Sequence, residues 1–150
     1  MTNRNGAASL LDLARDVVAR ARSHGAEQCD VLVGRYDESS VSVRLGEVEK
    51  LIEAGSRSLG LRVITGGGRT AVSSTSDLSD DALERLARET VELASISEAD
   101  PYAGLPDSTS FATGGANGLQ LYDERLGELT TEQMTAMAVV NRDVLFRIAE

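Results

Sequence analysis

Aromatic residues and cysteine are scarce in this sequence. Aromatic side chains make up 3% of its 150 residues, tryptophan is missing, and Cys29 is the single cysteine. The core is therefore expected to be aliphatic, and no disulfide can form within the chain. A catalytic thiol needs an activating base and a positive surround. We interpret Cys29 instead as a small buried residue that precedes a strand.

Basic residues and long apolar runs are also few. The chain has 15 Lys and Arg against 24 Asp and Glu, for a formal net charge of −9. That balance argues against nucleic acid and anionic membrane as partners, because both need a basic surface. No apolar run approaches the ~20 residues that span a bilayer, and the polar start lacks a signal-peptide core. We expect a cytoplasmic protein with no nucleic-acid and no membrane partner.

Strand-like alternation fills the centre of the chain, between residues 39 and 76. Val41, Val43 and Leu45 alternate with polar residues, which is the two-residue period of a half-buried strand. Strands are predicted in this way at 30–36, 41–45, 47–53, 58–65 and 69–74. The centre of the chain is therefore expected to be an antiparallel meander.

Glycines and polar clusters are predicted to interrupt these strands. We expect a turn at 37–40, a bulge or tight turn at Gly46, and a break at Gly55 and Ser56. The three glycines at 66–68 precede another strand pattern and carry neither phosphate-loop signature. We predict a hairpin turn there, and no phosphate-binding loop.

Helical periodicity flanks the strand region, with apolar residues at every third or fourth position. The predicted helices cover about 9–23, 79–95 and 130–148. Ser79 is a predicted N-cap, and Thr130 with Gln133 forms a predicted capping box. These patterns predict an α+β fold, in which about three to five antiparallel strands are flanked by helices.

The domain organisation is expected to be simple. We predict one domain over residues 1–150, with a frayed start at 1–7 and a long loop at 97–129. The loop contains both prolines of the chain, Pro101 and Pro106.

No group of residues has the pattern of a catalytic or metal site. Glu47 and Glu49 would lie about 7 Å apart on one strand face, but nothing beside them suggests the burial that acid–base catalysis needs. His24 is the single histidine, so the chain cannot supply the usual ligands of a zinc site. We predict no catalytic, cofactor-binding or metal-binding residue, and we expect the chain alone to be inactive.

Three phrases carry a resemblance to a known family. They are VSVRLGEVEKLIEAGSRSLGLRV at 41–63, AVSSTSDLSDDAL at 71–83 and DPYAGLPD at 100–107. In this order and spacing the sequence resembles the N-terminal domain of the TldD/PmbA family, and the third phrase is similar to its PmbA (TldE)-like branch. The leading helix and LTTEQM at 129–134 fit as well.

The resemblance implies a cytoplasmic metalloprotease complex. In this family TldD and its PmbA-like partner are two-domain proteins that together degrade unfolded peptides and mature some peptide antibiotics. Zinc belongs to the TldD subunit, on an HExxxH helix that the PmbA-like partner lacks. This chain is accordingly expected to be an N-terminal fragment of the non-catalytic subunit, without the family's C-terminal domain and without a cofactor of its own. The alternative is a stand-alone binding or scaffold domain with no protease role.

The same resemblance suggests contacts for a TldD-like subunit or an unfolded peptide. An extended peptide can pair with an exposed strand edge through main-chain hydrogen bonds. The pattern leaves open whether 41–45 or 58–65 is that edge. The candidate contact residues are Val41, Val43, Leu45, Tyr102 and Leu105.

Overall fold

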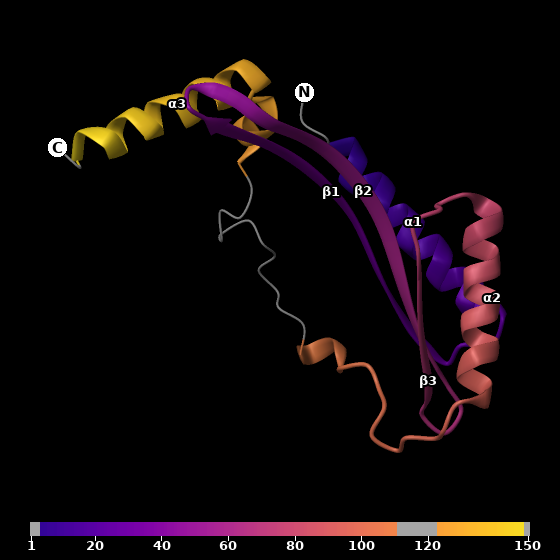
Figure 1. The fold of residues 1–150 in the computed structure, drawn as a ribbon. Coiled ribbons are helices and arrows are strands. Elements are labelled where there is room, and N and C mark those ends of the chain that lie inside the picture. The colour runs from indigo at the N-terminus through magenta and orange to yellow at the C-terminus, as the bar shows by residue number, and fades with distance from the viewer. Residues whose placement is uncertain (1–3, 111–122, 149–150) are drawn as a thin grey trace. The chain divides into compact units, whose positions relative to one another are not determined.

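The computed structural model describes residues 4–110 and 123–148. In this part of the chain, three α-helices, three strands and short 3₁₀ helices follow one another (Figure 1). They are α1 (Arg4–Ser23), β1 (Gln28–Arg44), β2 (Glu47–Thr65), β3 (Arg69–Thr75), α2 (Asp80–Ile96), η1 (Ser108–Ser110), η3 (Glu124–Glu128) and α3 (Thr131–Ile148). The strands form one antiparallel sheet in the order β1-β2-β3. The predicted α+β fold is therefore confirmed.

The chain divides into two compact units. The first holds the described residues of 1–35 and 56–112, and the second holds those of 36–55 and 113–150. β1 and β2 each contribute residues to both units. None of the described helices is long and apolar enough to cross a membrane.

The core of the first unit lies between the sheet and the helices α1 and α2. Leu59, Leu61 and Val63 are fully buried on one face of β2, because alternate residues of a strand point to the same side. They pack with apolar side chains from both helices. The helix residues in this cluster are Val17, Ala21, Leu83, Leu86, Ala87, Val91 and Ala94. The core is aliphatic, as the scarcity of aromatic residues predicts.

Ion pairs join α1 to α2 at the rim of this core. The guanidinium of Arg20 lies 2.7 Å from Asp16 on its own helix, and 2.9 Å from Asp80 and 3.5 Å from Glu84 on α2. His24 Nε2 lies 2.7 Å from Glu84 Oε1. These pairs fix the α1–α2 contact at the first turns of α2.

The turn between β2 and β3 is the hairpin expected from the run of glycines. Thr65 pairs with Arg69, and the Gly68 N–H donates to the Thr65 carbonyl at 3.1 Å. Gly67 and Gly68 have φ angles of 79° and 76°, which glycine adopts without a steric penalty. The segment that follows is β3, so the structure agrees with the hairpin interpretation.

The second unit combines the end of the β1–β2 hairpin with α3. Leu45 and Gly46 form the two-residue turn, with φ angles of 52° and 90°, the positive values that a type I′ turn requires. At the start of α3, the Thr130 N–H donates to Gln133 Oε1 at 2.9 Å and the Gln133 N–H donates to Thr130 Oγ1 at 3.3 Å. The predicted capping box is confirmed.

Two predicted interruptions of the sheet are wrong. β1 continues through the expected turn at 37–40, and β2 continues through Gly55 and Ser56. Both segments are exposed except for the half-buried Ser40, so their polarity does not oppose strand formation, and each backbone finds its hydrogen-bond partners on the neighbouring strand. The predicted helix near residue 9 also begins earlier, at Arg4. In the predicted loop, 111–122 lies outside the described residues.

Candidate functional site

β1 is an edge strand of the sheet, whereas β2 is the central strand. The candidate segment 41–45 therefore lies at the edge, and the candidate segment 58–65 lies between β1 and β3. Within the part of the chain that the structure describes, no strand pairs with the far side of β1. An edge of this kind presents N–H and C=O groups that can pair with another extended chain.

Three of the five candidate contacts lie close together, two on this edge and Leu45 in the turn that follows it. Val41 and Val43 are half-buried. Leu45 is 90% exposed and holds a φ of 52°, a conformation that costs a non-glycine residue about 1 kcal/mol. The turn geometry therefore displays a leucine side chain to solvent at the tip of the hairpin.

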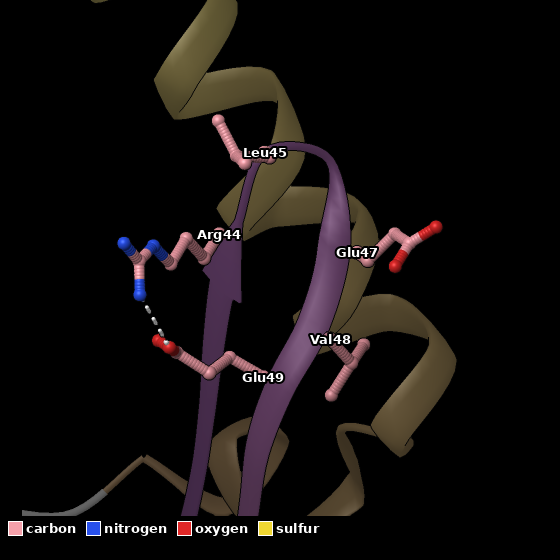
Figure 2. A pocket seen from close by; sticks show the side chains of 5 residues that line it. All are labelled: Arg44, Leu45, Glu47, Val48 and Glu49. Carbon is pink, nitrogen blue, oxygen red and sulfur yellow. Dashed lines mark hydrogen bonds and ion pairs between the residues drawn. The ribbon is translucent and has the colours of Figure 1, made fainter.

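A shallow, open depression of about 320 Å³ lies at the same tip. Arg44, Leu45, Glu47, Val48 and Glu49 line it (Figure 2). Figure 2 shows Arg44 and Glu49 on one side of the hairpin and Val48 on the other. The Arg44 guanidinium lies 3.3 Å from Glu49 Oε1. The depression thus combines an ion pair with two apolar side chains.

The chemistry of this depression suits binding better than catalysis. Its five lining residues include no hydroxyl, thiol or imidazole group. Glu47 and Glu49 are both exposed, whereas acid–base catalysis by paired carboxylates requires environments that separate their pKa values. Solvent also screens the Arg44–Glu49 pair, so its contribution to stability is small.

The other two candidate contacts lie in the first unit, on the segment that follows α2. Tyr102 is 94% exposed, and its N–H donates to Asp100 Oδ1 at 2.9 Å. The Leu105 N–H donates to Gln28 Oε1 at 2.8 Å, which ties the segment to the start of β1. The contact of Gln28 could not be predicted from sequence periodicity, because a single glutamine before a strand belongs to no recognisable motif. Tyr102 and Leu105 thus belong to the first unit, whereas Val41, Val43 and Leu45 belong to the second.

Cys29 is buried, as predicted, and its surroundings disfavour the thiolate. It is 7% exposed, and burial raises the pKa of the thiol, an effect that the nearby Arg22 only partly opposes. Among the described residues, no three His, Cys, Asp or Glu side chains lie close enough together to hold a metal ion.

Comparison with known proteins gives a family match and a structural likeness. Residues 29–94 match the model of the PmbA/TldA metallopeptidase domain 1. No curated protein matches the sequence significantly. A crystal structure from Bacteroides thetaiotaomicron, described as a proposed modulator of DNA gyrase, superposes with a TM-score of 0.77 at 24% identity over 91% of this chain. TldE from Thermococcus kodakarensis gives a TM-score of 0.55 at 14% identity over 63% of this chain.

The likeness is limited in two respects. At 24% and 14% identity the two solved structures show a shared fold alone. The chain also spans only 30% and 21% of their lengths. The family match covers β1 from Cys29, β2, β3 and most of α2, and it ends before the DPYAGLPD segment. The match at residues 29–94 thus shows that this part of the chain is similar to the first domain of the PmbA/TldA metallopeptidases.

Proposed function

We propose that this chain is the N-terminal part of a non-catalytic, PmbA/TldE-like subunit of a cytoplasmic metalloprotease. Its partner would be a TldD-like subunit that holds the zinc ion, and the complex would act on unfolded peptides. The observation that carries the proposal is the match of residues 29–94 to a metallopeptidase first domain. The DPYAGLPD segment and the likeness to TldE favour the PmbA/TldE branch.

The edge of β1 gives this subunit a physical role. An extended peptide, or a strand of the TldD-like subunit, would pair with β1 through main-chain hydrogen bonds. Such bonds do not depend on the side chains of the peptide, which suits substrates of varied sequence. Val41, Val43 and Leu45 would contact alternate side chains of the added strand, and Tyr102 and Leu105 would offer a second contact on the other unit.

The proposal is tested by association with a TldD-like subunit. The chain is co-expressed with that subunit, the mixture is separated by size-exclusion chromatography, and cleavage of an unfolded peptide is measured with and without a zinc chelator. We expect co-elution, and cleavage that requires the TldD-like subunit and is abolished by the chelator.

The opposite result has a defined meaning. If the two chains elute separately at concentrations well above micromolar, the subunit proposal is wrong. A stand-alone binding or scaffold domain would then be the better account. It would be supported if the chain resisted limited proteolysis in the 97–110 segment.

A further inference from the structure

One segment of the β1 edge, residues 39–43, lacks the usual protection against pairing with other chains. Natural edge strands carry charges, prolines or bulges that block such pairing. Residues 39–43 of β1 read Ser-Ser-Val-Ser-Val and include no charged residue, proline or glycine. Charges lie only at the two ends of this segment, at Glu38 and Arg44. The segment is therefore available for a strand with a matching sequence.

The hairpin turn determines which backbone groups face outward. Because Leu45 and Gly46 form a two-residue turn, the flanking residues Arg44 and Glu47 are the hydrogen-bonded pair next to it. Alternate residues of β1, counted back from Arg44, then bond to β2. The N–H and C=O groups of residues 39, 41 and 43 are directed away from β2, toward the open edge.

We infer that this edge pairs with a second copy of the chain, antiparallel, about a two-fold axis at Val41. In that register Val41 faces the Val41 of the other copy, and the outward groups of Ser39 meet those of Val43. Glu38 faces the Arg44 of the other copy, and by symmetry the pair is formed twice. An isologous interface of this kind uses the same surface on both copies, and the sequence 38–44 is self-complementary in charge.

Charge selects this register over its neighbours. An axis at Ser40 places Glu38 opposite Ser42, and an axis at Ser42 places Glu38 opposite Gly46, so both ion pairs are lost. The Arg44 side chain is 73% exposed and lies at the hairpin tip beside Glu49, where it can reach a facing carboxylate. Opposite charges directly across an antiparallel pair each contribute modestly to pairing.

The interface is short, so the dimer is expected to be weak. Small interfaces belong to the weak, transient class of protein–protein contacts. This inference does not depend on the proposed function, because it concerns the isolated chain. If this inference and the proposed function both hold, a peptide or a TldD-like strand competes with the second copy for the β1 edge.

Charge reversal at the two ends of the segment tests the inference. Sedimentation velocity of the 150-residue chain is expected to show a concentration-dependent monomer–dimer equilibrium. Glu38→Arg and Arg44→Glu each replace two attractions by two repulsions, so each should weaken self-association about tenfold or more. An equimolar mixture of the two variants restores both attractions and should dimerise at least as well as the original chain.

A proline variant separates the contribution of main-chain hydrogen bonds to the dimer from the contribution of charge. Val41→Pro removes an outward N–H, and an edge strand tolerates proline at such a position. It should weaken the dimer without loss of circular dichroism, whereas Ser42→Pro should destabilise the fold itself. The inference is overturned if the chain stays monomeric at all concentrations, if the mixture does not associate, or if β1 binds a peptide or TldD-like subunit with no self-association.

Discussion

Gly68 lies directly against the carbonyl of Asp100, so that a Cβ atom at residue 68 would overlap the carbonyl oxygen and lie 2.9 Å from the carbonyl carbon. The approach brings the β2–β3 turn together with the segment that follows α2. The same segment is tied to Gln28 through the Leu105 N–H. Two independent contacts therefore hold residues 100–105 on the first unit.

Gly68→Ala is predicted to destabilise the first unit by about 3 kcal/mol. Part of the cost, about 1 kcal/mol, comes from the left-handed φ of 76°, and the rest comes from the overlap with backbone that cannot move aside easily. The measurement is the free energy of unfolding from urea titration. Gly67→Ala is the matched control, since its φ is 79° but its nearest neighbour is the Ala99 Cβ at 3.9 Å. Equal losses in the two variants would show that the contact with Asp100 has no energetic role.

The helices and the general plan of the sheet could be predicted because they follow from periodicity and local chemistry. The apolar face of α2 and the pairing of Thr130 with Gln133 depend on residues three or four positions apart. Such signals are complete within a short stretch of sequence. The hairpin at 66–68 is local in the same sense, because glycine supplies the positive φ that the turn requires.

The length of the strands could not be predicted from those signals. Residues 37–40 and Gly55 look like turns in isolation, and only pairing with the opposite strand makes them extended. The candidate contacts show the same limit. That 41–45 is at the edge and 58–65 is central depends on the order β1-β2-β3, which no single segment encodes. The contacts of Gly68 with Asp100 and of Gln28 with Leu105 join residues that are far apart in the sequence. They form only when the segment after α2 has folded, so no local pattern predicts them.

Arg20→Ala is predicted to cost about 1–2 kcal/mol of folding free energy. The Arg20 side chain is 22% exposed and pairs with Asp16, Asp80 and Glu84, so its removal leaves three carboxylates close together. The loss should shrink as salt is added, because the remaining repulsion is screened. Arg15→Ala is the control, as its pair with Asp12 is 76% and 71% exposed, and it should change stability by less than about 0.5 kcal/mol. A loss for Arg20→Ala that is independent of salt would contradict the electrostatic account.

The Cys29 thiol is predicted to be unreactive in the folded protein. Burial raises its pKa, which lowers the fraction of reactive thiolate, and the surrounding core blocks access. Labelling by a disulfide reagent at neutral pH should be about 100-fold slower than at an exposed thiol. The comparison is Ser76→Cys in a Cys29→Ser background, because residue 76 is exposed. Rapid labelling of native Cys29 would show that it is not part of the core.

Asp77 is predicted to contribute stability that is lost in acid. Its Oδ1 accepts the Ser79 N–H at 2.9 Å, and the hydrogen bonds from the backbone and side chain of Ser79 lower the pKa of this carboxyl below 3.8. Because the folded pKa is the lower one, the contribution is fully present above about pH 4 and disappears as the pH falls through the folded value.

The variants Asp77→Ala and Asp77→Asn separate the charge of this residue from its hydrogen bond. Ser79 makes no side-chain cap of its own, so Asp77→Ala leaves the N–H at the start of α2 without its acceptor. That variant should be less stable at neutral pH and should lose less stability on acidification. Asp77→Asn keeps an acceptor but cannot titrate, so it should retain more stability than Asp77→Ala at neutral pH and share its flatter acid response. The measurement is the urea midpoint over about pH 3 to 7, a range that covers the titration of carboxyl groups. If both variants kept the acid response of the original chain, other carboxylates would have to account for it, and the bond from Ser79 to Asp77 would not be its source.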